Sequence, residues 1–420
     1  MTREPESSLS RQCKARAIAF YLPQFHPIPE NDSWWGAGFT EWTNVAKAKP
    51  IFRRHHQPRT PSELGFYDLR LPETRAAQAE LAQEAGIEGF CYWHYWFAGK
   101  RLLERPFNEV LASGEPDFPF CLAWANQTWS GIWHGAPNRI LIEQSYPGPE
   151  DHERHFETLL PAFRDSRYIC VRNRPLFLIH RPTEFPDLPA FIEQWQKLAQ
   201  QAGLEGIHFV AHLLPQDECD WEKAGFAGAT SVAALKVSSM SIVKLIKRRA
   251  AEMVRGRGEG VSLGEHVCAV GRILHYTVRR VWEKITGMTR PIYHYKDAML
   301  FFLDGVRHRA NSYPCLVPNW DNSPRSGLRG QVIIGSTPAL FARHVRAAVQ
   351  LVRERAFEDR ILFVKSWNEW AEGNYLEPDL KFGRQYLEAL RGELLGSEAD
   401  REAAENSAAT SIAPELSCTR

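Results

Sequence analysis

Two glutamates, Glu369 and Glu372, stand three positions apart in the run S-W-N-E-W-A-E-G at residues 366–373. Making or breaking a glycosidic bond needs one carboxylic acid that protonates the departing oxygen and one carboxylate that acts as base or nucleophile. Two glutamates from one turn can fill both roles if their surroundings separate their pKa values. The same spacing also suits the first turn of a helix, where acidic side chains interact with the helix dipole. The flanking Trp and Asn residues favour the catalytic interpretation.

Tryptophan is abundant, with 14 in the chain, and many stand beside His, Asn, Asp or Glu instead of inside apolar runs. An indole face stacks on the C–H face of a sugar while polar neighbours bind its hydroxyl groups. A single tryptophan of this kind is as often a core residue, so the argument depends on the whole set. The residues expected to bind substrate follow or end apolar runs, and they are Tyr21, Gln24, His26, Trp93, His94, Tyr95, Trp124, Asn126, His180, His212, Asn319, Trp320, Asp321, Trp367, Asn368 and Trp370.

Eight short apolar runs alternate with helical patterns, which is typical of a parallel sheet covered by helices. The predicted strands are residues 17–22, 87–93, 119–125, 175–180, 207–212, 229–234, 313–318 and 361–367. A helix is predicted over 72–85, with Pro72 at its start and Gly86 just past its end. The pattern predicts an α/β fold, a (β/α)8 TIM-type barrel over residues 15–395. Active-site residues of such barrels follow the C-terminal ends of the strands.

Residues 236–290, between the sixth and seventh predicted strands, break the alternation and are rich in Lys and Arg. The run at 242–249 predicts a basic amphipathic helix. Two interpretations stay open for this insertion: a solvated helical lid, or a surface at 242–257 that contacts an anionic membrane next to a lipid-linked oligosaccharide. The ends of the chain, residues 1–14 and 396–420, are predicted to be flexible and disordered, because they have little to bury.

Charge and cysteine content exclude several classes of partner. A formal net charge of +1 over 420 residues predicts no nucleic-acid partner. The eight cysteines show no C-x-x-C spacing, so we expect no metal and no other cofactor. No Gly-rich turn joins a first strand to a helix, which argues against a Rossmann-type nucleotide-sugar transferase. The polar N-terminus and the lack of a long apolar run predict a cytoplasmic protein, with peripheral contact at the inner face of the membrane as an alternative.

Several motifs together resemble a known family. They are Y-L-P-Q-F-H (21–26), F-T-E-W-T-N (39–44), W-H-Y (93–95), W-A-N (124–126), N-W-D-N-S-P-R (319–325) and W-N-E-W-A-E-G (367–373). In this combination the chain resembles the WbsX-type proteins, which are described as bacterial glycosyltransferases of polysaccharide and O-antigen clusters and are similar to glycoside hydrolase family 99, the endo-α-mannosidases. The resemblance covers about residues 15–386.

The resemblance implies a metal-free barrel and, as in family 99, a retaining mechanism through a 1,2-anhydro sugar. Carried over by motif, Glu369 takes the proton of the substrate's 2-hydroxyl, and Glu372 is the general acid and then the general base. The absence of an export signal and the basic insertion favour glycosyl transfer in lipopolysaccharide biosynthesis. Hydrolysis of the endo-α-mannosidase type is the alternative, and a non-catalytic glycan-binding barrel is the second alternative.

Overall fold

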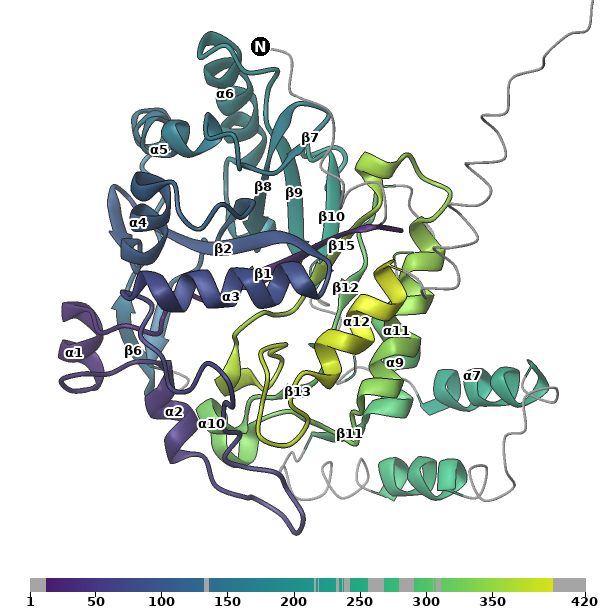
Figure 1. Cartoon of the computed structure of the whole chain (residues 1–420). Helices are drawn as coiled ribbons and strands as arrows, with labels where there is room; N and C mark the ends of the chain where they lie inside the picture. Colours follow the sequence, from purple (N-terminus) through teal and green to yellow (C-terminus); the bar gives the residue numbers. More distant parts are fainter. Residues whose placement is uncertain are drawn as a thin grey trace, which may run out of the picture.

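The computed structural model describes residues 13–395 except 132–135, 215–216, 218, 232–233, 236, 238–241, 256–267, 279–290, 305 and 307–310. An inner parallel sheet is surrounded by helices (Figure 1). The sheet runs in the order β10-β9-β8-β4-β2-β1-β15-β12. These strands are β1 (Arg16–Tyr21), β2 (Ile87–Phe97), β4 (Phe120–Trp124), β8 (Arg174–His180), β9 (His208–Leu213), β10 (Gly228–Ser231), β12 (Cys315–Leu316) and β15 (Ile361–Val364).

The edge strands β10 and β12 close the sheet into a barrel. The amide of Ala229 donates to the oxygen of Asn311 at 3.0 Å, and the amide of Tyr313 donates to the oxygen of Ala229 at 2.7 Å. The residues next to Tyr313 enter β12, so every strand of the path has a neighbour on both sides. The predicted (β/α)8 fold is confirmed, and each predicted strand has a counterpart in the barrel.

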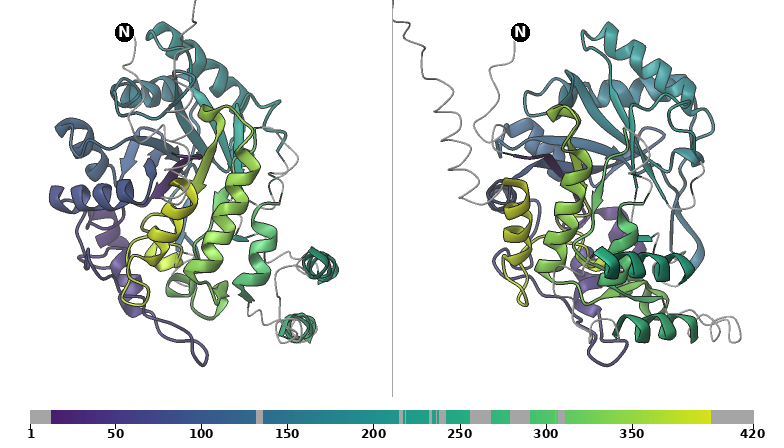
Figure 2. Two further views of the ribbon diagram at one scale, coloured as in Figure 1. Left: turned by 45° about the vertical axis from the view of Figure 1, so that its right-hand side comes forward. Right: turned by 90° about the vertical axis from the view of Figure 1, so that its right-hand side faces the viewer.

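Amphipathic helices cover the outside of the barrel (Figure 2). They are α3 (Pro72–Glu84), α4 (Arg105–Ser113), α5 (Pro149–Phe163), α6 (Leu188–Gln201), α9 (Tyr295–Phe302), α11 (Pro338–Val352) and α12 (Gln385–Leu395). The apolar side of each helix faces the sheet; Phe191 and Trp195 of α6, for example, are fully buried. The barrel interior is itself filled with aromatic rings, since Phe20 stacks on Trp93 with ring centroids 5.0 Å apart. Burial of each such side chain contributes about 1.5–3 kcal/mol.

Short elements decorate the mouth and the sides of the barrel. They are α1 (Pro29–Trp35), α2 (Glu41–Lys47), α10 (Ser323–Ser326), the hairpin strand β3 (Lys100–Leu102), β5 (Trp129–Gly131), β6 (Ala136–Ile142), β7 (Cys170–Val171), and a side sheet of β11 (Ile292–His294), β14 (Val332–Ile334) and β13 (Trp320–Asp321). The side sheet was not predicted, because its strands have only two or three residues each.

The described parts of the insertion are helical. One helix is α7 (Ile242–Arg255) and a second covers residues 268–278, and both lie outside the barrel beside α9 (Figure 1). The predicted disordered tail, 396–420, and nearly all of the predicted flexible N-terminus lie outside the described residues. At the base of the barrel the amide of Lys14 donates to the oxygen of Leu394 at 2.9 Å. None of the helices among the described residues is long and apolar enough to span a bilayer.

Candidate active site

The end of β15 is tied to the end of β1, and this fixes where the glutamate run begins. The amide of Trp367 donates to the oxygen of Phe20 at 2.8 Å, which continues the ladder between the strands. The carboxamide of Asn368 then accepts from the amide of Leu22 at 2.7 Å and donates to its oxygen at 3.0 Å. Asn368 therefore mimics one more backbone pair, and the chain leaves the barrel at a defined point at the mouth.

The two glutamates flank a single tight turn. The 3-10 helix η8 (Trp370–Glu372) begins after Glu369 and ends at Gly373, which has a left-handed φ of 61°. A Cβ at Gly373 would lie 2.9 Å from the Arg59 guanidinium and 3.0 Å from Asp321, so only glycine fits here. The alternative interpretation, a pair at the start of a regular helix, is not what the structure shows, since η8 has three residues.

Two cations alternate with the two carboxylates. Lys365 Nζ lies 2.5 Å from Glu369 Oε2 and 3.7 Å from Glu372 Oε2. Arg325 Nη1 lies 2.8 Å from Glu372 Oε1 and 3.7 Å from Glu369 Oε1, and its Nε donates to Glu41 Oε1 at 2.8 Å. All five side chains are largely buried, which leaves three carboxylates facing two cations. We call these five residues the charged cluster.

The surroundings push the pKa values of the two glutamates in opposite directions. Burial, and then the negative charge of Glu372, raises the pKa of Glu369 above its ordinary value, against the attraction of Lys365 and Arg325. Burial acts the same way on Glu372, but Arg325 and Lys365 outweigh it and lower the pKa of Glu372. Of the two glutamates, Glu369 therefore holds its proton more tightly, and this separation of pKa values is what acid–base chemistry by a pair of carboxyl groups requires.

Aromatic and imidazole side chains line the barrel interior next to the charged cluster. Lys365 Nζ lies 5.5 Å from the centre of the Trp93 ring, which also contacts His180 and His212. The two imidazoles share a hydrogen bond of 2.7 Å between their Nδ1 atoms. Burial, followed by Arg181 and Lys365, lowers the pKa of His180 to about 3, and burial with His180 and Lys365 also lowers the pKa of His212. Both rings are therefore neutral, and Nε2 of His212 has no hydrogen-bond partner among the described residues.

Tyr95 adds a phenol to the same surface. Its pKa is raised by burial first and then by the charge of Glu369, with Glu41 and Glu372 contributing. These contributions place Tyr95 beside the charged cluster. Of the predicted substrate-binding residues, the structure thus gathers four around the glutamate pair, namely Trp93, Tyr95, His180 and His212.

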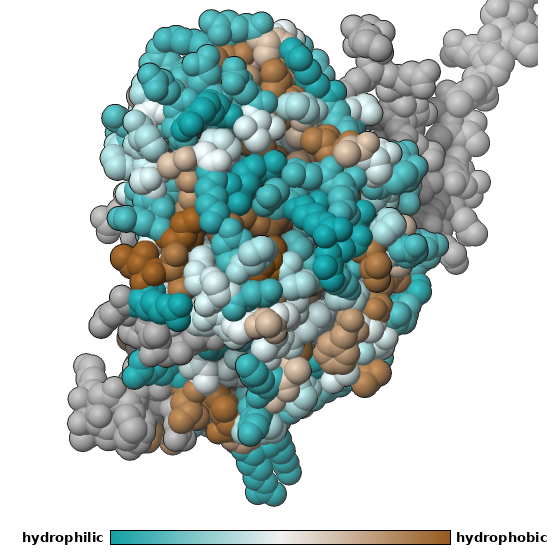
Figure 3. Space-filling model, turned by 90° about the vertical axis from the view of Figure 1, so that its left-hand side faces the viewer, coloured by the Kyte–Doolittle hydropathy of each residue, from teal (hydrophilic) through white to brown (hydrophobic). Residues whose placement is uncertain are grey.

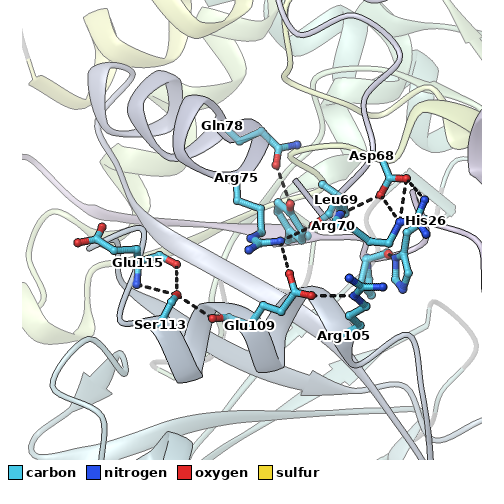
Figure 4. Close-up of polar contacts among 12 residues, drawn as sticks. His26, Asp68, Leu69, Arg70, Arg75, Gln78, Arg105, Glu109, Ser113 and Glu115 are labelled. Atoms are coloured by element: carbon cyan, nitrogen blue, oxygen red, sulfur yellow. Dashed lines mark hydrogen bonds and ion pairs between the residues drawn. The ribbon is translucent and has the colours of Figure 1, made fainter. Parts of the chain in front are cut away.

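Tyr21 and His26 lie away from the pair. The hydroxyl of Tyr21 donates to Gln78 of α3 at 2.7 Å, in the layer between the barrel and that helix. The ring of His26 hydrogen-bonds to the oxygen of Pro23 at 2.9 Å, and Figure 4 shows it beside Asp68 and Arg70. Gln24 is linked to the charged cluster through its backbone oxygen, which accepts a hydrogen bond from the amide of Glu41 at 2.9 Å.

His94, Trp124 and Asn126 lie on the helix side of the barrel. His94 Nε2 lies 2.8 Å from Nε2 of His155 in α5, and the Trp124 indole packs against the same His155 ring at a centroid distance of 4.8 Å. Asn126 donates to the hydroxyl of Tyr146 at 3.0 Å. The structure therefore does not bring these three residues to the glutamates.

The remaining predicted residues support the mouth of the barrel. Asp321 is fully buried and accepts from His55 and Gln57 at 2.7 Å each. Burial raises its pKa, but the hydrogen bond from His55 and the charge of Arg59 outweigh burial and lower the pKa to about 2. Trp370 donates to Glu377 at 2.5 Å. The others are held in place by backbone or core contacts: Asn319 caps the amide of the next residue, Trp320 belongs to the core cluster of the side sheet, and Trp367 packs on Phe90.

Four buried charged residues escaped the sequence prediction of the site. Arg325 and Glu41 stand inside the motifs 319–325 and 39–44, but their contact with the pair is long-range. Lys365 was missed because it stands at the end of an apolar run. Glu377 accepts from Trp370, from Tyr67 at 2.9 Å and from Gln78 at 2.6 Å, and burial raises its pKa to about 7. Among the described residues no group of three or more His, Cys, Asp or Glu is arranged to hold a metal ion.

Comparison with known proteins shows the family and the fold of the chain. A family model described as Glycosyltransferase WbsX matches residues 17–390. Two proteins named WxcX from strains of Xanthomonas campestris pv. campestris are each 35% identical, over 91% and 92% of this chain, and the chain spans about half the length (50%) of each.

Two solved structures share the fold. One is a glycoside hydrolase-like protein, with a TM-score of 0.55 and 13% identity over 94% of this chain and 98% of the other. The second is the GH99 endo-alpha-mannosidase from Bacteroides thetaiotaomicron, with a TM-score of 0.51 and 14% identity over the same shares. The family match runs from β1 through every strand of the barrel into α12, and the chain therefore belongs to the WbsX glycosyltransferase family.

Proposed function

We propose that the chain is a carbohydrate-active enzyme that acts on glycosidic bonds through Glu369 and Glu372. The observation that carries the proposal is the charged cluster, in which two buried carboxylates have pKa values shifted in opposite directions. Buried charge costs several kcal/mol per ion before pairing, and a fully apolar arrangement is often as stable. Perturbed carboxylates that lie beside an aromatic-lined barrel interior are therefore better explained by chemistry than by stability.

In the proposed reaction one glutamate gives its proton to the departing oxygen as the C–O bond breaks, and the other takes a proton from the attacking hydroxyl group. The resemblance assigns the base role to Glu369 and the acid role to Glu372. The surrounding charges and the burial of the pair favour the reverse, because the pKa of Glu369 is raised and that of Glu372 is lowered. We adopt the electrostatic assignment, with Glu369 as the acid, and the experiment below separates the two.

The sugar would lie against Trp93 and Tyr95, whose faces and hydroxyl group suit a pyranose. Nε2 of His212, which has no hydrogen-bond partner among the described residues, would meet a sugar hydroxyl. Because both imidazoles are neutral, they can donate and accept hydrogen bonds without adding charge beside Lys365.

The family description supports glycosyl transfer. We propose, as the resemblance implies, that this transfer belongs to the assembly of a bacterial surface polysaccharide such as O-antigen, with a lipid-linked acceptor on the cytoplasmic side. The barrel shared with a GH99 endo-alpha-mannosidase supports hydrolysis of an α-mannoside as the second candidate. The two reactions differ only in whether a sugar hydroxyl or water takes the glycosyl group.

The test replaces each glutamate by glutamine, with Glu377→Gln as a matched buried control. Turnover of α-glycosyl fluorides of mannose, glucose and galactose, and of their disaccharides, would be measured with water and with sugar acceptors. We expect Glu372→Gln to lose about 10³-fold in turnover while glycan binding persists. Wild-type protein that binds glycan but turns over none of these donors would instead support a glycan-binding barrel.

Fluoride leaves without protonation, so it identifies the acid. If Glu369 is the acid, Glu369→Gln keeps most of its activity on a fluoride donor but loses it on an unactivated glycoside. If Glu372→Gln shows that pattern, the assignment implied by the resemblance is the correct one.

A further inference from the structure

The two helices of the insertion expose an unusual number of large apolar side chains. Val243 and Ile246 on α7 are 61% and 48% exposed, and Val270, Leu274 and Val278 on the second helix are 60–63% exposed. On the opposite side of the molecule, apolar side chains form small separate groups among polar ones (Figure 3). Rows of exposed apolar residues are rare on a protein surface and mark contact sites.

The second helix has apolar side chains on two opposite sides, one buried against the protein and one exposed to solvent. Val270, Leu274 and Val278 are spaced by four residues and form one row, while Ala269 and Tyr276 on the opposite side are buried. The helix therefore rests on the protein with one side and presents an apolar row with the other. This row, with Val243 and Ile246 of α7, is called the apolar platform.

A buried carboxylate of α9 holds both helices in place. Asp297 accepts from Arg249 of α7 at 3.0 Å and from Arg272 and Tyr276 of the second helix at 2.8 and 2.9 Å. Arg248 of α7 also pairs with Asp304 at 2.8 Å. Because one carboxylate binds both helices, the two helices that carry the apolar platform are held at fixed positions beside α9. Figure 2 shows the two helices lying roughly parallel and projecting from the body.

The insertion is also strongly basic. Between residues 236 and 290 the sequence has twelve Lys and Arg against four Asp and Glu, a formal charge of +8 in a chain whose total is +1. Three of these arginines hold the helices to α9, while Lys247 is exposed on α7. Apolar side chains framed by basic ones complement a lipid bilayer with anionic head groups.

The platform is attached to the wall of the active site. β11 follows the insertion directly and pairs with β14, which pairs with β13, the strand that carries Asp321. Arg325 of the charged cluster stands four residues further on. In Figures 1 and 2 both helices lie at the same end of the molecule as α2 and α10, the elements that supply Glu41 and Arg325.

We infer that the apolar platform docks on an anionic membrane surface, with Val270, Leu274 and Val278 inserted between head groups. This inference goes beyond the proposed function, because adsorption to a membrane needs no turnover and is measured without it. A nucleic acid is the poorer match, since a phosphate backbone offers the apolar row nothing to contact.

The experiment measures co-sedimentation of the whole protein with vesicles of phosphatidylcholine containing about one third phosphatidylglycerol. We expect binding to these vesicles, weaker binding to pure phosphatidylcholine, and roughly tenfold weaker binding for a Val270→Glu/Leu274→Glu variant. Lys247→Glu should weaken binding by a few-fold and make it less sensitive to salt. Leu274→Glu alone is measured as well, and its matched control is Leu71→Glu, which places the same single charge at a residue that is 53% exposed at the start of α3.

Equal binding of Leu274→Glu and the Leu71→Glu control would overturn the inference. So would a wild-type dimer that the Val270→Glu/Leu274→Glu variant converts to monomer in sedimentation velocity without vesicles, because a second copy would then cover the row. Binding of a single-stranded oligonucleotide in place of vesicles would also overturn it. Since glycosyl fluoride turnover is measured without lipid, loss of one property does not imply loss of the other.

Discussion

The charged cluster and the apolar platform are opposite exceptions to the usual distribution of side chains. The cluster buries charged side chains, and the platform exposes large apolar ones. At the mouth of the barrel, Glu369 and Glu372 are only 5% and 9% exposed, whereas Leu274 on the platform is 63% exposed. Folding alone favours charge outside and large apolar side chains inside. Binding of a ligand at either region can therefore lower the free energy of the folded protein. The difference is that the cluster is stabilised by its own ion pairs, whereas nothing among the described residues covers the platform.

This difference predicts that the stability of the folded protein depends on the buried charges of the cluster and little on the exposed apolar side chains of the platform. A charge that is removed from the cluster leaves the others buried without compensation, so the effect is large. Replacing an apolar residue of the platform changes the free energy of unfolding little, because its side chain is largely exposed to solvent in both the folded and the unfolded state.

The largest effect is expected for Arg325→Met. Arg325 is the cation that pairs with Glu41 and Glu372, so its loss takes away the ion pair of Glu41 and leaves Glu372 with the more distant Lys365 at 3.7 Å. We expect the free energy of unfolding in urea to fall by about 3–5 kcal/mol. Lys197→Met is the control, because its pair with Glu193 is exposed to solvent and should contribute far less to stability. Equal losses in the two variants would mean that the cluster is not a structural unit.

Glu377 gives the next largest effect, through pH. Its pKa of about 7 lies above the ordinary 4.5, so the folded protein holds this proton more tightly than the unfolded chain. Its contribution to stability is present below pH 4.5 and is lost as the pH rises through 7, by about 3 kcal/mol in total. Glu377→Gln should flatten this part of the profile of unfolding free energy against pH, whereas Glu193→Gln at an exposed site should leave it unchanged. An unchanged profile in Glu377→Gln would contradict the prediction.

Lys365→Met should shift the pH dependence of activity. Lys365 lowers the pKa of both glutamates, so without it Glu372 becomes charged only at higher pH. We expect the acidic limb of the kcat/KM profile to move up by about one pH unit, which corresponds to about 1.4 kcal/mol. The exposed Lys381→Met is the control and should keep the wild-type limb. A limb that stays in place in Lys365→Met would show that Lys365 does not set the charge of the pair.

The smallest effect is expected on the platform. Val270→Ser combined with Leu274→Ser should change the free energy of unfolding by less than about 0.5 kcal/mol, because both side chains are about 60% exposed. Thermal unfolding against wild type measures this. A loss of more than about 1 kcal/mol would mean that the row packs against protein, and the comparison with the charged cluster would fail.

The barrel could be predicted from the sequence because each strand is a local signal. The run at 361–364, for instance, is apolar and fully buried, and the helices between strands have clear apolar sides. The side sheet and the exact length of β2 could not be predicted. The predicted strand ends at Trp93, but β2 continues to Phe97, and its last residues form a hairpin with β3.

The site was only partly predictable because neighbouring residues of a strand point to opposite faces. Within β2, Trp93 and Tyr95 face the interior, while His94 and Trp96 contact His155 of α5 on the outside. Position at a strand end does not tell which face a side chain takes. The partners of the glutamates were missed for another reason: Arg325 and Glu41 are 284 residues apart, and a single sequence does not show such pairing.

The hydrogen bond between Lys14 and Leu394 means that the polypeptide enters and leaves the barrel at one place, where β1 begins. That place is at the opposite end from the mouth. A module fused before residue 14 or after residue 394 would therefore be attached at the end of the barrel that lies away from the charged cluster and the apolar platform. A circularly permuted chain, with these two points joined and new termini cut elsewhere, should for the same reason fold into the same molecule.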